Sequence, residues 1–142
     1  MLEPNIREQI IELIHRQVVP AVGCTEPMAV ALCAARATEL LGEKPEKVSV
    51  LLSANILKNA MGVGIPGTGM IGLPIAIALG VLIGKSDYRL EVIKDLTPES
   101  LEAGKRFIGE DRIDIKLKEG ITEKLYIEVA CVAGGQIGRA HV

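Results

Sequence analysis

Cys24 is the residue of this 142-residue chain whose position most favours chemical reactivity. It follows Gly23 and stands directly before a helix that we expect to begin near Thr25. The N-terminus of a helix presents unpaired N–H groups and a partial positive charge, which favour the thiolate and lower the pKa of a cysteine placed there. Such a thiolate can act as a base or a nucleophile. The alternative is that Cys24 is a small buried hydrophobic residue.

The neighbours of Cys24 have simple structural roles as their first explanation. Thr25 is an N-cap, and Glu26 is a first-turn acid that complements the helix dipole. The other two cysteines, Cys33 and Cys131, lie in apolar stretches, so we expect both in the core. Three cysteines without a Cys-x-x-Cys pair indicate neither a disulfide framework nor a zinc site, and they fit a reducing cytoplasm.

A second polar cluster follows the buried strand that we expect to end at Ser53. Asn55, Lys58 and Asn59 share one face if this segment is helical. Two amides and an ammonium group on one face could hold an α-carboxylate. A solvated helix explains the same residues equally well.

The segment from Gly62 to Gly72 is rich in glycine, which lets the backbone approach a ligand closely. It contains Gly-x-Gly-x-x-Gly twice, and the second match, which begins at Gly67, leads into a helix as a dinucleotide site requires. The strand that should precede the glycines is short and is interrupted by Pro66. Binding of a small anion or a nucleotide by this loop is therefore an alternative function.

Hydrophobic periodicity predicts the elements that must position these residues. The expected helices are Asn5–Val18, Thr25–Leu41, Ala54–Met61, Leu73–Ile83 and Thr97–Gly109. The expected strands are Glu46–Ser53, Arg89–Lys94, Ile113–Leu117, Leu125–Val129 and Ile137–Val142, the last after a turn at Gly134-Gly135. The fold class is α/β (α+β), a single domain with a small mixed sheet of about four to five strands packed with about four to five helices. One of these helices, Leu73–Ile83, is apolar and buried.

Composition excludes several kinds of partner. The net charge is −2 and aromatic residues make up 2% of the chain, so we expect no nucleic-acid partner. The uncharged stretch Ala60–Gly84 is long enough to cross a bilayer, but only Leu73–Ile83 is a continuous helix former, about three turns long. We therefore expect a buried helix and no membrane partner.

Four motifs occur in the order of a known family. They are Pro20–Pro27, Ser53–Asn59, Gly62–Pro74 and Leu90–Asp95. Together they resemble the N-terminal region of the L-cysteine desulfidase family, which is related to the α chain of iron–sulfur L-serine dehydratase. The resemblance covers nearly the whole chain. It implies that residues 1–142 are a fragment, the N-terminal part of a longer serine dehydratase α-chain-like lyase.

The resemblance also implies a reaction, namely α,β-elimination on L-cysteine or L-serine to give pyruvate, ammonia and sulfide or water. The family uses a [4Fe–4S] cluster as a Lewis acid. The cysteine of its Gly-Cys-Thr-Glu-Pro motif, which is Cys24 here, is the proposed catalytic base. The candidates for contacts with a small-molecule amino-acid substrate are then Thr25, Glu26, Asn55, Lys58, Asn59, Gly67, Thr68 and Gly69.

The chain departs from the family in one respect. The cysteines that hold the family's cluster lie far downstream, and neither Cys33 nor Cys131 matches them. We therefore expect a [4Fe–4S] cluster in the full-length parent, no cofactor or metal site in this chain, and no turnover by the chain alone. A non-catalytic structural or interaction domain is a further alternative. The strand expected at the end of the chain could pair with a second copy, which allows a homo-oligomer.

Overall fold

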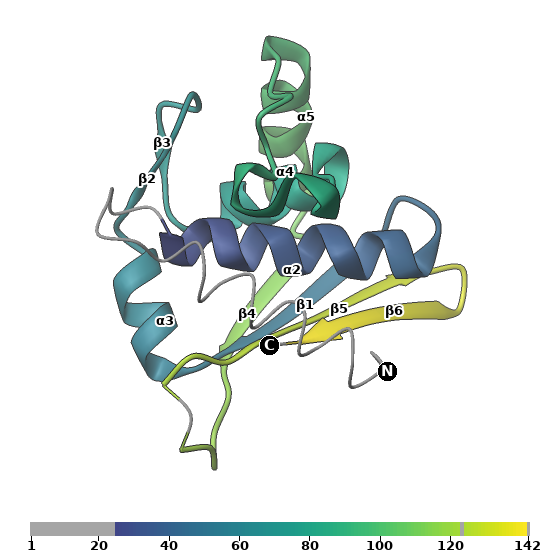
Figure 1. Ribbon diagram of the computed structural model, residues 1–142. Coiled ribbons are helices and arrows are strands. Elements are labelled where there is room, and N and C mark those ends of the chain that lie inside the picture. Colours follow the sequence, from purple (N-terminus) through teal and green to yellow (C-terminus); the bar gives the residue numbers. More distant parts are fainter. Residues whose placement is uncertain (1–24, 123, 142) are drawn as a thin grey trace.

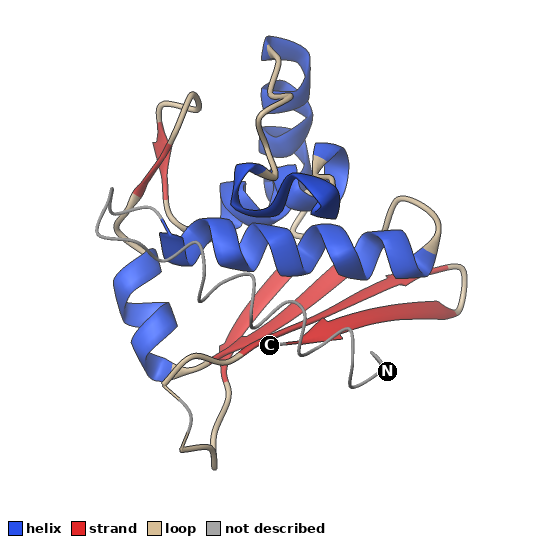
Figure 2. Cartoon of the chain, in the orientation of Figure 1, coloured by secondary structure: helices blue, strands red, loops and turns tan. Residues whose placement is uncertain are grey.

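The computed structural model describes residues 25–122 and 124–141, which form one α+β domain. A four-stranded mixed sheet lies against the long helix α2, and helices α4 and α5 lie on the far side of α2 (Figure 1). Figure 2 shows α2, α4 and α5 above the sheet, and α3 beside it. The predicted fold class is therefore confirmed. Cys24 and the predicted helix Asn5–Val18 lie outside the described residues.

The four-stranded sheet has the order β4-β1-β5-β6. Its strands are β4 (Ile113–Leu117), β1 (Lys47–Leu52), β5 (Ile127–Ala133) and β6 (Gln136–His141). β1 is parallel to β4 and antiparallel to β5. In β1 every second side chain is buried in the core, as an amphipathic strand requires. β5 begins two residues later than we predicted, at Ile127 rather than Leu125.

The hairpin between β5 and β6 was predicted and is confirmed. Its loop is Gly134-Gly135, with φ values of 55° and 81°. Two residues with positive φ form the type I′ turn that matches the twist of the flanking strands, and glycine adopts this conformation without strain.

Helix α2 (Thr25–Leu41) covers one face of the sheet. Most of its alanines are completely buried, so its surface is smooth and lets neighbours approach closely. The helix ends at Gly42, whose φ is 84° and whose N–H donates to the Thr38 carbonyl at 3.0 Å. This is the glycine C-cap that the sequence predicts.

Helix α4 (Leu73–Ile83) has the bounds that we predicted and is buried between α2 and α5 (Pro98–Gly109). Its fit against α2 depends on Gly80, because a Cβ there would lie 2.6 Å from the Ala31 carbonyl oxygen. Within residues 25–122 and 124–141 no helix is long and apolar enough to cross a membrane. α5 starts with a capping box in which the Thr97 hydroxyl accepts from the Ser100 N–H at 3.1 Å.

The segment between β1 and α4 contains three small elements. Helix α3 (Ala54–Ala60) confirms the predicted short helix. The glycine-rich stretch, expected as a loop, contains two very short strands, β2 (Gly64–Ile65) and β3 (Met70–Ile71), which form a separate two-stranded sheet.

The predicted strand Arg89–Lys94 is wrong. The chain there forms the 3₁₀ segment η1 (Ser86–Glu91), broken at Arg89 by φ 59° and ψ −128°. The physical reason lies in Val92 and Ile93, which are consecutive and both buried. A strand would send them to opposite faces, whereas a helical turn brings both toward the same core.

Gly80→Ala should lower the free energy of unfolding by about 1–3 kcal/mol, because the new methyl group collides with the backbone of α2. Gly109→Ala is the matched control, since it also lies in a helix but has nothing within 4 Å of an added Cβ. That variant should be neutral or gain up to about 1 kcal/mol. Urea unfolding of both variants measures the difference, and equal midpoints would show that α2 and α4 are not in close contact.

Arg89→Gly should raise the unfolding midpoint and increase the free energy of unfolding by about 1 kcal/mol. Arg89 occupies the conformation of the first central residue of a type II′ turn, where glycine is normal and a long side chain is strained. Asp111→Gly is the comparison, because Asp111 has a φ of 58° but aspartate tolerates the left-handed region. Its gain should be smaller. A lower midpoint for Arg89→Gly than for the parent chain would contradict the strained turn.

Candidate functional site

The site residues predicted at the start of α2 are only partly described. Cys24 lies outside the described residues, so its role as a base stays a prediction. Thr25 opens the helix, and Glu26 is half-buried in its first turn. An acid in this position complements the helix dipole, as expected.

The predicted polar cluster lies on the outside of α3. Asn55, Lys58 and Asn59 are all exposed, whereas Ile56 and Ala60 form the buried side of the helix. Asn55 lines a hollow of about 560 Å³ together with residues of the loop after β4, among them Lys118 and Lys124. The cluster therefore shares one helix, as predicted, and the hollow that Asn55 lines differs from the one lined by Gly67.

The predicted contacts at Gly67, Thr68 and Gly69 lie at the tip of the hairpin formed by β2 and β3. Pro66 and Gly67 occupy the centre of a turn in which the Thr68 N–H donates to the Ile65 carbonyl at 3.2 Å. The φ of Gly67 is 79°, so proline followed by a glycine with positive φ indicates a type II turn.

Thr68 contributes to the shape of this turn. Its buried hydroxyl donates to the Ile65 carbonyl at 2.7 Å and accepts from the Met70 N–H at 2.9 Å. The hydroxyl is thus engaged within the hairpin. The glycines join two antiparallel strands, which differs from the strand-to-helix turn of a dinucleotide site.

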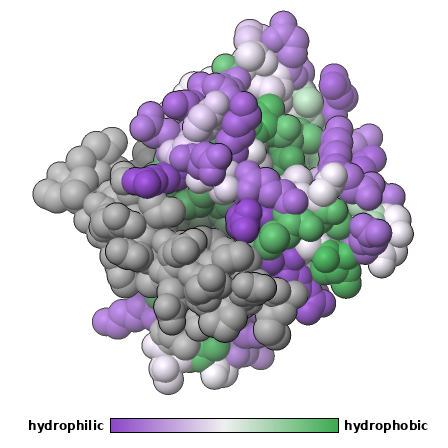
Figure 3. Space-filling view, turned by 45° about the vertical axis from the view of Figure 1, so that its right-hand side comes forward, coloured by the Kyte–Doolittle hydropathy of each residue, from purple (hydrophilic) through white to green (hydrophobic). Residues whose placement is uncertain are grey.

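The described residues enclose one large apolar cavity beside this turn, with a volume of about 640 Å³. Its walls come from the start of α2, the hairpin tip, the segment after η1 and the start of α5. The lining residues are Met28, Pro66, Gly67, Leu90, Glu91, Ile93, Lys94, Leu96, Thr97, Pro98 and Leu101. On the face that Figure 3 shows, hydrophilic side chains cover much of the described surface, with groups of apolar side chains between them. Most of the residues that line the cavity were not predicted from the sequence.

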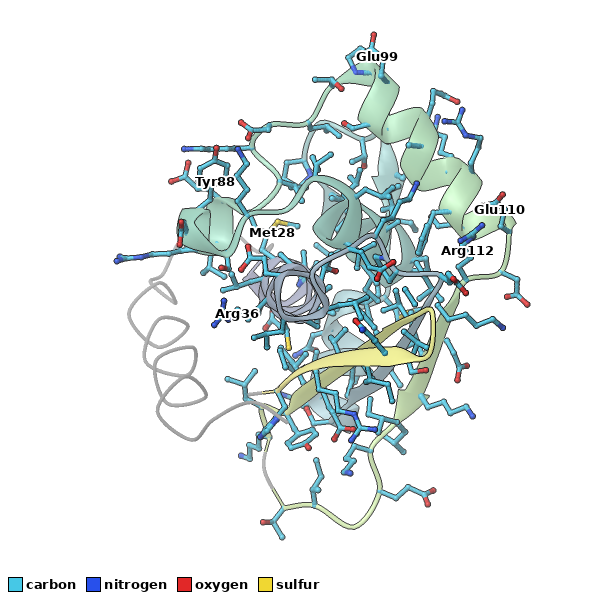
Figure 4. The ribbon with its side chains drawn as sticks, turned by 90° about the vertical axis from the view of Figure 1, so that its right-hand side faces the viewer. Met28, Arg36, Tyr88, Glu99, Glu110 and Arg112 are labelled. Carbon is cyan, nitrogen blue, oxygen red and sulfur yellow. The ribbon has the colours of Figure 1, made fainter. Side chains whose placement is uncertain are left out.

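Two charged side chains of opposite sign, Glu91 and Lys94, stand at the cavity and are exposed. The Lys94 ammonium lies 4.1 Å from the centroid of the Tyr88 ring, a cation–π distance. The Tyr88 hydroxyl donates to Asp95 at 2.9 Å, which holds the ring in place. Figure 4 shows Met28 between α2 and the segment that carries Tyr88.

Cys33 and Cys131 are fully buried, as predicted for core residues. Burial raises the pKa of the Cys131 thiol to about 11, although its hydrogen bond with the Thr38 hydroxyl opposes this rise. Burial, reinforced by the nearby Cys131, raises the pKa of Cys33 further. The part of the chain that the structure describes contains no group of three or more His, Cys, Asp or Glu residues that could hold a metal ion.

Cys33 and Cys131 should stay unmodified by iodoacetamide in the native chain at pH 8, because alkylation requires an accessible thiolate. Both should react once the chain is unfolded in guanidinium chloride, which serves as the control. Peptide mass spectrometry reads the modification, and rapid native labelling of either thiol would contradict the buried placement.

The buried Cys131 thiol also makes stability depend on pH. Because its pKa rises from 9.0 to about 11 on folding, the contribution of the protonated thiol to the free energy of unfolding is complete below pH 9 and is lost as the pH rises toward 11.

Comparison with known proteins finds proteins that are highly similar to this chain. The chain is 76% identical over 136 residues to the UPF0597 protein BF3560 of Bacteroides fragilis, a match that covers 96% of this chain and 32% of that protein. It is 69% identical over 142 residues to a UPF0597 protein of Phocaeicola vulgatus, covering 100% of this chain and 33% of the relative. A UPF0597 protein of Oleidesulfovibrio alaskensis is 48% identical over 140 residues, covering 99% and 32%. The chain thus spans about a third of the length of the curated relatives it matches.

These relatives correct the resemblance drawn from the four motifs. The assignment to the L-cysteine desulfidase family is wrong, and the iron–sulfur lyase chemistry of amino-acid catabolism that it implied loses its support. The proteins that match 96–100% of the chain are named UPF0597 proteins, and those names state no activity, substrate or cofactor. No family model matches the chain, and no solved structure does. The chain is similar over nearly its whole length to UPF0597 proteins.

Proposed function

We propose that this chain is a binding module whose cavity beside Met28 holds a small molecule with an apolar body and a polar end. The observation that carries the proposal is the cavity itself, whose volume of about 640 Å³ falls in the range of small-molecule sites. The sequence suggested, as an alternative function, that the glycine-rich loop binds a small anion. The proposal keeps small-molecule binding but places it in this cavity, because Gly67 is the one predicted glycine contact that lines it.

Apolar side chains supply the greater part of the wall. Leu90, Ile93 and Leu96 come from one short segment, and Leu101 comes from the first turns of α5. Burying a ligand's aliphatic surface against them yields about 25 cal/mol for each Å² removed from water. The body of the ligand that fits this wall is therefore aliphatic.

Polar groups at the cavity define the other end of the ligand. Lys94 offers an ammonium to a carboxylate, and Glu91 offers a carboxylate to an amine. The Gly67 N–H is a second donor, since no acceptor among the described residues engages it. These groups support an amino acid with an aliphatic side chain as the first ligand to test, and a simple aliphatic carboxylate as the second.

The compartment is part of the same proposal. Cys33 and Cys131 are both free thiols, and free buried cysteines are typical of the reducing cytoplasm.

The test is a binding titration followed by NMR on the isotope-labelled chain, with leucine, an aliphatic carboxylate and an aliphatic amine as probes. Binding should shift the resonances of Leu90, Ile93 and Leu101, which line the cavity. Lys94→Gln should weaken the carboxylate-bearing probes about tenfold, because it removes a charge-assisted hydrogen bond.

Lys105→Gln is the matched control, because Lys105 is an exposed lysine of α5 that does not line the cavity. It should leave every affinity unchanged. The proposal fails if none of the probes shifts the lining resonances, or if Lys105→Gln weakens binding as much as Lys94→Gln does.

A further inference from the structure

The hairpin of β2 and β3 projects from one end of the described domain. In Figure 1 it rises beside the start of α2, away from the four-stranded sheet. Each of its strands has two residues, and the hairpin pairs with no other strand among the described residues. A two-stranded hairpin is marginally stable in water unless something packs against it.

One side of this hairpin packs against the domain. Ile65, with 3% of its surface exposed, belongs to the same apolar cluster as Ile75 and Val92. Met70, its cross-strand partner, is half-buried and packs against that cluster too. The inner side of the hairpin is therefore anchored to the core.

Among the described residues, the outer side of the hairpin contributes no side chain to either apolar cluster. Side chains alternate along a strand, so Ile71 points away from the side that carries Met70, and it is 66% exposed. Its cross-strand partner is Gly64, which has no side chain to shield it. Ile71 thus has the greatest exposed fraction among the large exposed apolar side chains that the structure describes.

A second exposed apolar residue lies at the base of the same hairpin. Met61 is 45% exposed, and its carbonyl oxygen would lie 3.0 Å from a Cβ added to Gly72, the residue after Ile71. Single exposed apolar residues are ordinary on a protein surface. Here one lies on the hairpin and the other is the residue whose backbone meets the hairpin's base, and we call the surface that includes both the outer hairpin surface.

We propose that the outer hairpin surface, made by Met61 and Ile71, docks against the polypeptide that makes up the other two-thirds of proteins of this type. The greater length of the relatives supports this docking. The relatives match this chain almost completely, yet the match covers only 32–33% of each of them. In those proteins a longer stretch of chain adjoins the part that matches this domain, and burial of exposed apolar surface would drive its packing against the domain.

The test compares one substitution in two contexts. Ile71→Glu is made in this 142-residue chain and in a chimera in which this chain replaces the matching 136 residues of the Bacteroides fragilis relative. In the chain alone the substitution should leave Tm unchanged, because the side chain is already in water. In the chimera it should lower Tm by about 4 °C or more, because the charge would be buried at the interface.

Ile137→Glu is the matched control. Ile137 is 53% exposed and lies in β6, on the four-stranded sheet rather than on the hairpin. Its effect should be the same in the chain and in the chimera. An equal effect of Ile71→Glu in the two contexts would overturn the proposal. So would a 142-residue chain that is dimeric by light scattering and becomes monomeric with Ile71→Glu, since a second copy would then be the partner.

Discussion

The close contact between α2 and α4 is the constraint on which the rest of the described structure depends. It is possible only because Gly80 has no side chain where it meets the backbone of α2 at Ala31. α4 is apolar along nearly all of its surface and would be insoluble on its own, so it must be covered on several sides. α2 covers one side and α5 another. Their positions then set where η1 and the hairpin of β2 and β3 can lie.

The cavity is a consequence of this arrangement. Met28 reaches it from the first turns of α2, and Leu101 reaches it from the first turns of α5. The start of α5 is held by the Thr97–Ser100 capping box, which uses the Thr97 hydroxyl internally. The cavity is therefore mostly apolar, with its charge confined to Glu91 and Lys94. Such a site selects for shape and aliphatic surface first and for a polar end second.

Local signals predicted much of the fold. The bounds of α4 followed from a continuous apolar run, the start of α5 from a threonine followed by proline, and the β5–β6 hairpin from two adjacent glycines. The prediction of a strand around Arg89 was wrong. Its apolar residues suggested a strand, whereas a turn buries the two consecutive side chains of Val92 and Ile93 on the same side. The site could not be predicted in the same way. Met28 and Leu101 are ordinary apolar helix residues, and only the tertiary packing of their helices places them in one cavity.

The sheet order has a consequence for how the chain folds as it is synthesised. β1 is a central strand, yet both of its neighbours lie far downstream, since Val48 faces Ile113 in β4 and Cys131 in β5. Pairings so distant in sequence form slowly, because a long loop must first be closed. Until the ribosome has made β4 and β5, the apolar side chains of β1 have no sheet to join. During that interval β1 is the segment most exposed to pairing with the wrong strand, and a chaperone that shields it would protect the nascent domain.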